Sequence, residues 1–326
     1  MVDYVMSVRD VENGSFVAEV GPTHFLIVPD GQTPAPSHTV DAAIWYEGVI
    51  TEAAWENNKG DARGDILFIV HGYNMSSAEV IDRHRRIKAD LNDLKFQGVI
   101  VSFDWPSDDK ALAYLPDRHR AKITAMQLVT DGIAQLSARQ SPECNTNIHV
   151  LGHSTGAYVI REAFDDADDT GLKNPAWNVS QLIMAAGDVS AGSMSDGNPE
   201  SESIYGHCVR LTNYSSRHDE ALDLSNVKRV GTAPRVGRIG LPSGAPNKAV
   251  NVDCTDYYER LTKAGSDIAD DQRDHQFVGM QSHSWYFGNR MFAKDLFAVM
   301  IGLDRTVSYT RDPIANNAFS LKHTLK

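Results

Sequence analysis

The sequence predicts an α/β protein with a mostly parallel central sheet and helices on both of its faces. From about residue 61 onward, short apolar runs of strand length alternate with stretches of helical periodicity. The apolar runs are continuous, which is typical of strands buried on both faces. A chain of 326 residues that is 42% hydrophobic can also bury a large core, and single α/β domains reach this size.

Each predicted core strand is one of these apolar runs. The runs are residues 65–70, 98–103, 147–151, 181–186, 208–214 and 249–254. The last of them is expected to be the final strand of the sheet. Because parallel strands end at the same edge, we expect a ligand beyond their carboxyl ends.

Helices are predicted between the strands. Ser76 and Ser77 are good N-caps, and apolar residues recur at helical spacing after them, at Val80, Ile87, Leu91 and Leu94. A second helix is predicted around residues 119–137, where one apolar stripe is formed by Ile123, Met126, Val129, Ile133 and Leu136. A third is predicted over residues 157–164.

The first 60 residues follow a different pattern. Residues 16–20 and 25–29 look like short strands joined by a turn at Gly21-Pro22, which predicts an antiparallel hairpin at the sheet edge. We interpret the chain as a single domain over residues 1–326, made of N-terminal edge strands (1–60), a core (61–302) and a C-terminal tail (303–326).

The charge and the N-terminus restrict the possible partners. The net charge is −12 and the pI is about 5.4, so no basic surface for nucleic acid or for an anionic membrane is expected. The N-terminus has no basic region followed by an apolar stretch, and no run approaches the ~18 apolar residues of a membrane span. We therefore expect a cytoplasmic protein with neither a nucleic acid nor a membrane as partner.

The sequence gives no sign of a metal site. The three cysteines are widely spaced and form no C-x-x-C pattern, which argues against a zinc ribbon or a redox pair. The acidic run at 165–169 does not fit a calcium loop, because the twelfth position counted from Asp166 is Trp177 instead of glutamate. We expect neither a metal nor a cofactor.

The segment Gly152-His153-Ser154-Thr155-Gly156 matches the pattern G-x-S-x-G. In α/β-hydrolases this pattern forms a sharp strand-to-helix turn that lifts the serine hydroxyl above the sheet edge, and the glycines let strand and helix approach closely. The pattern alone occurs by chance in about one chain of this length in ten. Here the strand before it and the helix after it supply the required setting, so Ser154 is the predicted nucleophile.

Two acids are candidates for the partner of the catalytic histidine. In this fold the triad follows the order serine, acid, histidine along the chain. Asp188 follows the predicted strand at 181–186, and Asp219 follows the strand at 208–214. The usual acid position follows the latter strand, which favours Asp219. Asp188 is the alternative, and either residue could instead be a capping or turn aspartate.

Two histidines follow the last predicted strand, His275 and His283. His283 stands immediately before an apolar helical segment, from which a loop histidine can reach over the serine turn. We therefore favour His283 as the base and keep His275 as the alternative. His71 and His153 are expected to be structural.

The segment His71-Gly72-Tyr73-Asn74 directly follows the first buried strand. A turn in this place supplies one backbone N–H of an oxyanion hole, which by position is that of Tyr73. The residue after the nucleophile, Thr155, supplies the other.

Taken together, four motifs resemble a bacterial α/β-hydrolase family that is catalogued as a domain of unknown function. The motifs are residues 71–74, 152–156, 214–222 and 283–287, and the resemblance spans about residues 61–300. It implies the α/β-hydrolase fold and a serine hydrolase with the triad Ser154, Asp219 and His283. It implies no particular substrate.

The expected activity is hydrolysis of a small-molecule carboxylic ester through an acyl-enzyme, without a cofactor. An amidase, thioesterase or lactonase would use the same residues, because the acyl half of the mechanism is common to all of them. The rival from another class is a non-catalytic binding protein that has kept the fold. The presence of serine, acid, histidine and oxyanion turn together argues against that rival.

The expected site is open and shallow. Many hydrolases of this fold carry a lid where this chain has only the polar residues 189–207, so no large lid is expected. Tyr73, Trp105 and Trp285 are predicted to line an acyl pocket, with core or rim packing as the alternative. Such a pocket buries few methylenes at about 0.8 kcal/mol each, so esters of roughly two to six acyl carbons should be favoured.

Overall fold

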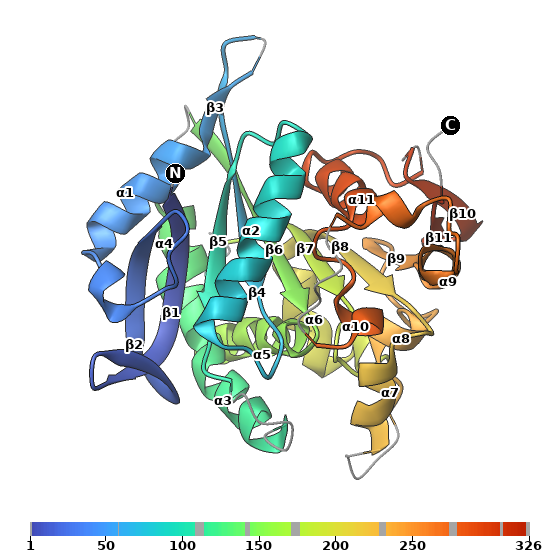
Figure 1. The fold of residues 1–326 in the computed structure, drawn as a ribbon, viewed down its shortest axis with the longest axis horizontal. Helices are drawn as coiled ribbons and strands as arrows, with labels where there is room; N and C mark the ends of the chain where they lie inside the picture. Colours follow the sequence, from blue (N-terminus) through green and yellow to red (C-terminus); the bar gives the residue numbers. More distant parts are fainter. Residues whose placement is uncertain are drawn as a thin grey trace.

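One sheet forms the centre of the structure, with strands in the order β10-β11-β9-β8-β7-β6-β4-β5-β1-β2 (Figure 1). The computed structural model describes residues 2–57, 59–107, 114–140, 144–170, 177–227, 233–273, 279–306 and 309–323, without the side chains of 114–118, 144 and 224–227. The strands are β1 (Val2–Glu12), β2 (Ser15–Pro29), β3 (Ala54–Glu56), β4 (Ala62–Val70), β5 (Val99–Asp104), β6 (Cys144–His153), β7 (Val179–Ala185), β8 (Cys208–Ser215), β9 (Ala249–Asp253), β10 (Arg311–Ala315) and β11 (Ala318–Leu321).

The helices lie on both faces of this sheet (Figure 1). They are α1 (Ala42–Ala53), α2 (Ser77–Asp93), α3 (Tyr114–Gln127), α4 (Ala134–Ser137), α5 (Thr155–Asp169), α6 (Pro199–Gly206), α7 (Glu220–Val227), α8 (Val236–Ile239), α9 (Thr255–Thr262), α10 (Gln281–Ser284) and α11 (Arg290–Met300). A π-helical segment, Leu128–Ile133, joins α3 to α4. The helix predicted after Ser76 is α2, and the Ser76 side chain accepts the Glu79 N–H as an N-cap.

The centre of the sheet is parallel, as the continuous apolar runs predict. All pairs from β1 through β5, β4, β6, β7, β8 and β9 to β11 are parallel. The six predicted core strands correspond to β4 through β9. Antiparallel pairing is confined to β2, β3 and β10 within the described residues. The carboxyl ends of the parallel strands therefore share one edge, where a site is expected.

The N-terminal hairpin differs from the prediction. Both predicted strands, together with the turn predicted between them, belong to the single strand β2, which pairs antiparallel with β1. The hairpin turns at Asn13-Gly14, where both residues have positive φ (50° and 77°). Gly21 marks a close approach, because a Cβ there would lie 2.6 Å from Asp10 Cα. The register between β1 and β2 shifts on either side of Arg9. Gly21 therefore lies at a β-bulge and not at a turn.

The C-terminal tail also contributes to the sheet. Residues 303–326 contain β10 and β11, and β11 pairs in parallel with β9. The prediction that the run at 249–254 is the last strand is therefore wrong. Both strands are short, and Pro313 interrupts β10, so neither presents the continuous apolar run on which the prediction depended.

The two larger hydrophobic cores lie on opposite faces of the sheet, and a smaller cluster joins β1, β2 and α2. Side chains of a strand point alternately to the two faces. In β4, Ile66 and Phe68 enter the core that α1, α3, α5 and α6 cover, whereas Leu67 and Ile69 enter the core that α2, α9 and α11 cover. This double burial explains why the core strands lack the alternating pattern of a half-exposed sheet.

The segment between β7 and β8 is short and packs on the body of the protein. It forms a 3-10 turn, Gly192–Met194, and then α6, which packs against α5 and buries Ile204 and Tyr205 in the first core. Among the helices that the structure describes, none has both the length and the apolar character to cross a membrane.

Candidate active site

Ser154 occupies a strained turn between β6 and α5. Its φ is 57° and its ψ is −125°, a conformation that residues other than glycine rarely adopt. The flanking glycines are required by close contacts. A Cβ at Gly156 would lie 2.1 Å from Val70 O, and one at Gly152 would lie 2.6 Å from Ile160 Cδ1. The backbone of this turn thus has the geometry expected for the G-x-S-x-G pattern.

Backbone hydrogen bonds hold the serine turn to the neighbouring strand ends. The Ser154 N–H donates to Ala185 O at 3.0 Å, and Ser154 O accepts from the Asp188 N–H at 2.9 Å. The loop after β4 lies against the serine side chain, because a Cβ at Gly72 would be 2.9 Å from Ser154 Cβ and 3.3 Å from Ser154 Oγ. The serine therefore stands between the ends of β4, β6 and β7.

Asp219 and His283 form a buried hydrogen-bonded pair. His283 Nδ1 lies 2.7 Å from Asp219 Oδ2, and Asp219 is 0% exposed. The other carboxylate oxygen accepts the Leu222 N–H at 2.9 Å, so Asp219 also caps the start of α7. A carboxylate only accepts hydrogen bonds, so the proton of a neutral His283 lies on Nδ1 and Nε2 is left as an acceptor.

The sequence left two alternatives open, Asp188 for the acid and His275 for the base. Asp188 is buried and forms an ion pair with Arg235, whose Nε lies 3.1 Å from Asp188 Oδ1. Its carboxylate is therefore engaged elsewhere, whereas that of Asp219 contacts His283. His275 lies outside the described residues.

His153 connects the serine turn to the histidine. Its Nε2 lies 2.9 Å from the carbonyl oxygen of His283, and the ring centroids of the two histidines are 4.7 Å apart. Arg83 Nη1 donates to His153 Nδ1 at 3.1 Å. Burial, followed by the charge of Arg83, holds the pKa of His153 well below its usual value, so the ring carries a single proton. That proton lies on Nε2, where it is donated to His283 O.

Arg83 is a residue of the site that the sequence reasoning missed. It is 6% exposed, its Nη2 donates to Ser284 Oγ at 3.2 Å, and its guanidinium lies 4.7 Å from the centre of the Phe287 ring. It thus holds the segment that carries His283 from the side of α2. A signal was present, because Arg83 falls on the same helix face as Val80 and Ile87, where a charged residue is unusual.

The loop after β4 is fixed by His71 and Trp105. The N–H of Trp105 donates to His71 Nε2 at 3.2 Å, and its indole N–H donates to His71 O at 2.8 Å. The two rings are stacked at 5.2 Å, and His71 Nδ1 donates to Gly72 O at 2.7 Å. Burial lowers the pKa of His71, which matches the single proton that these contacts require. His71 is structural here, as expected.

The aromatic residues predicted to line an acyl pocket differ in burial. Trp105 and Trp285 are both 0% exposed, so their indoles pack in the protein interior and form no open pocket wall. Trp285 packs against Tyr257, Tyr286 and Phe292 in the core between the sheet and α11. The prediction of a pocket wall is wrong for these two residues. Tyr73 is half-buried and remains at the surface of the loop after β4.

Comparison with known proteins identifies the fold. A family model described as "Alpha/beta hydrolase of unknown function" matches residues 50–259, which include Ser154 and Asp219. Similar solved structures include a putative cell surface hydrolase from Lactobacillus plantarum (11% identity, 73% of this chain and 91% of that chain, TM-score 0.35). An esterase from Rhizomucor miehei is also similar (13% identity, 78% of this chain and 73% of that chain, TM-score 0.34). So is esterase B from Lactobacillus rhamnosis (8% identity, 74% of this chain and 78% of that chain, TM-score 0.39). No curated protein matches the chain.

Proposed function

The chain belongs to a family of α/β-hydrolases of unknown function, and we propose that it is a serine hydrolase that cleaves carboxylic esters. The observation that carries the proposal is the 2.7 Å contact between His283 Nδ1 and Asp219 Oδ2. This pair stands beside the strained serine turn, because His153, the neighbour of Ser154 in the chain, contacts His283 directly. A hydroxyl, an imidazole and a buried carboxylate in this order support nucleophilic acyl transfer.

The proposed reaction proceeds in two halves. Ser154 Oγ attacks the acyl carbon while His283 Nε2 takes the hydroxyl proton, and the tetrahedral intermediate collapses when His283 returns that proton to the leaving alcohol. Water then attacks the acyl-enzyme with His283 again as the base, which releases the acid and the free serine. Asp219 keeps the proton of the neutral imidazole on Nδ1 and stabilises the imidazolium that forms in each half.

The negative oxygen of the intermediate is assigned to two backbone donors. The Thr155 N–H belongs to the first turn of α5, where N–H groups have no acceptor within the helix. The Tyr73 N–H follows Gly72, whose backbone is next to Ser154. Preorganised donors of this kind typically contribute about 3–4 kcal/mol each to the transition state.

The serine assignment is tested by labelling with a serine-directed phosphonate. We expect modification of Ser154 alone, and we expect Ser154→Ala to lower kcat by several orders of magnitude while the protein stays folded. Ser201→Ala is the matched control, because Ser201 is also buried (1% exposed) but lies on α6. Undiminished turnover by Ser154→Ala would exclude the mechanism.

A substrate screen separates the remaining alternatives. Amides, thioesters and lactones share the acyl half of the reaction with esters, so the leaving group decides among them. We propose a preference for short esters of roughly two to six acyl carbons, since a shallow site buries few methylenes. The fold of residues 189–207, which pack as α6 on α5, supports a site without a lid over this segment. A kcat/KM that is highest for amides or for long acyl chains would contradict the ester proposal.

A further inference from the structure

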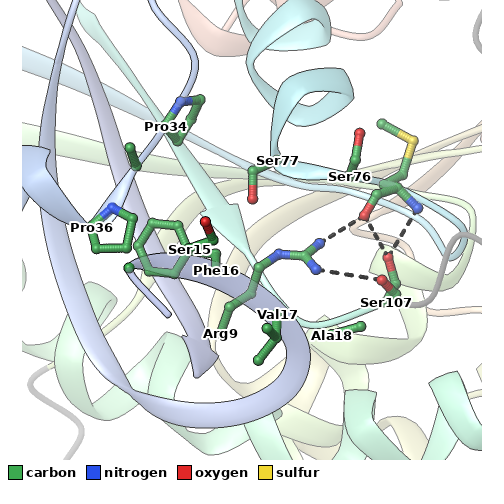
Figure 2. Close-up of a pocket in the computed structure, with 13 residues that line it drawn as sticks. Arg9, Ser15, Phe16, Val17, Ala18, Pro34, Pro36, Ser76, Ser77 and Ser107 are labelled. Carbon is green, nitrogen blue, oxygen red and sulfur yellow. Dashed lines mark hydrogen bonds between the residues drawn. The ribbon is translucent and has the colours of Figure 1, made fainter. Parts of the chain in front are cut away.

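Arg9 contacts the end of the loop after β4 from a strand outside the matched family region, which begins at residue 50. β1 runs parallel to β5, with Ser7 opposite Asp104 in the register. Arg9 lies two residues further along, so its side chain points to the same face of the sheet as that of Ser7, at the edge where the strands end. It is 4% exposed and borders a cavity of about 390 Å³ beside the start of α2 (Figure 2).

The guanidinium of Arg9 holds the far end of the loop that contains Tyr73. Arg9 Nη2 donates to Met75 O at 2.7 Å, and Nη1 donates to Ser107 O at 3.4 Å (Figure 2). Ser107 Oγ accepts the Met75 N–H at 3.0 Å and also lies 3.1 Å from Met75 O. Both backbone groups of Met75 are therefore fixed by buried side chains.

Asp104 connects Arg9 to the near end of the same loop. Arg9 Nε lies 2.7 Å from Asp104 Oδ1, and the next residue in the chain, Trp105, donates both its backbone and its indole N–H to His71 at the start of the loop. The second oxygen of Asp104 accepts from Ser77 Oγ at 2.8 Å, at the start of α2. Burial by itself would raise the pKa of Asp104, but the charge of Arg9 holds the pKa below its usual range. Asp104 is therefore a charged, fully buried anchor.

Tyr73, whose N–H is assigned to the oxyanion, lies between residues that are held in place. Gly72 rests against Ser154, Asn74 has a φ of 59°, and Met75 is held by Arg9. The backbone on both sides of Tyr73 is therefore held in place. A misplacement of about 1 Å in such a group can cost about a hundredfold in rate.

We propose that Arg9 is a positioning residue for the oxyanion hole, which it orients by fixing Met75 and Asp104. The inference rests on the proposed function, because it concerns the same site. Arg9 touches no reacting atom in this proposal. It gives the N-terminal strand pair a specific role in the reaction, beyond extending the sheet.

The test compares Arg9→Lys with Arg311→Lys in the full-length protein. Arg311 is a matched control, since it is 5% exposed and pairs at 2.7 Å with Asp295, which is 0% exposed. Lysine keeps the charge in both variants but not the planar fork, with which Arg9 bonds Asp104 and backbone carbonyls and Arg311 bonds Asp295 and Tyr214. We expect Arg9→Lys to lower kcat by about tenfold to a hundredfold with KM within about twofold, and Arg311→Lys to leave both nearly unchanged.

A boronic acid inhibitor supplies a readout that general destabilisation does not move. Its tetrahedral serine adduct places an oxygen in the oxyanion hole, so its Ki in Arg9→Lys should rise by the factor by which kcat/KM falls. Wild-type kcat and Ki in Arg9→Lys would overturn the inference, as would equal losses in Arg311→Lys. If the wild-type protein itself neither hydrolyses esters nor binds the boronic acid, the proposed function fails instead. Active-site titration corrects all rates for the folded fraction.

Discussion

At the scale of single residues, the site depends on side chains held in conformations that are costly in isolation. Ser154 has a φ of 57°, and for a residue other than glycine this backbone conformation costs about 1–3 kcal/mol. The hydrogen bonds to Ala185 and Asp188 keep it there. Asp219 is likewise fixed twice, by the Leu222 N–H and by His283. These residues are held rigidly, as a preorganised catalytic group requires.

The role of Asp219 is tested by Asp219→Asn. Asparagine can still cap α7 through its carbonyl oxygen, so stability should be largely retained. Its amide N–H would face His283 Nδ1 and would favour the tautomer that carries the proton on Nε2, where it cannot accept the serine proton. By analogy with other Ser-His-Asp triads, kcat should fall by about four orders of magnitude.

Asp188→Asn serves as the comparison for this prediction. The variant loses the charge that pairs with Arg235 and should be less stable, because a buried guanidinium is left without its counter-charge. Steady-state kinetics corrected for active-site concentration separates the two effects. If Asp188→Asn shows the larger loss of kcat and Asp219→Asn stays active, the acid has been assigned to the wrong residue.

At the scale of elements, the site forms where helices pack against strand ends, in one place so closely that only glycine fits between them. α5 meets the end of β4 at Gly156, and α2 brings Arg83 to the serine turn and His84 to Ser102 of β5. Both helices start at the carboxyl edge of the sheet. Their N-termini therefore share the edge on which Ser154, Asp219 and His283 gather.

Gly156→Ala should show how tight this approach is. The new Cβ would lie 2.1 Å from Val70 O, and a backbone carbonyl at a strand end can move little. We expect a loss of about 3 kcal/mol or more in the free energy of unfolding, measured by denaturant titration.

Gly206→Ala is the control for this substitution. Gly206 ends α6 and has no atom within 4 Å of its Cβ position, so alanine should stabilise by about 0.5–1 kcal/mol. A Gly156→Ala variant as stable as the wild type would show that strand and helix can separate at the turn.

At the scale of the whole molecule, three of the buried histidines link folding to pH. His71, His84 and His153 are each at most 2% exposed, and burial lowers the pKa of all three. They are distributed over the end of β4, α2 and the end of β6. Their protonation therefore couples the stability of the entire domain to pH.

The sign of this coupling follows from proton counting. Below the ordinary histidine value of 6.5, the unfolded chain binds protons that the folded protein does not, so stability falls as the pH falls. Each histidine that stays neutral in the folded protein should contribute about 1.4 kcal/mol per pH unit as the pH falls from about 6.5 toward its lowered pKa. The carboxylates Asp3 and Asp104, whose pKa values are lowered, lose their contribution as the pH falls below their ordinary value of 3.8.

Denaturant titrations between about pH 8 and about pH 5 measure this slope. His153→Gln should reduce this slope, because burial lowers the pKa of His153 and glutamine does not titrate. A free energy of unfolding that stays constant over this range would show that the histidines are protonated in the folded state.

Features that depend on neighbouring residues could be predicted from the sequence. The six central strands, the N-cap of α2 and the serine turn follow from patterns within about ten residues, because periodicity and turn chemistry act locally. The order of Ser154, Asp219 and His283 along the chain was also predictable, since the turn motif implies it.

Contacts between residues that are distant in the chain could be found only from the folded structure. Arg9 and Asp104 are 95 residues apart, and Arg83 and Ser284 are 201 apart, so no local pattern records either contact. The same holds for the pairing of β2 with β1 and for the complete burial of Trp105 and Trp285. Such contacts depend on the packing of elements that are far apart in the chain, where the free energy of burial outweighs local preference.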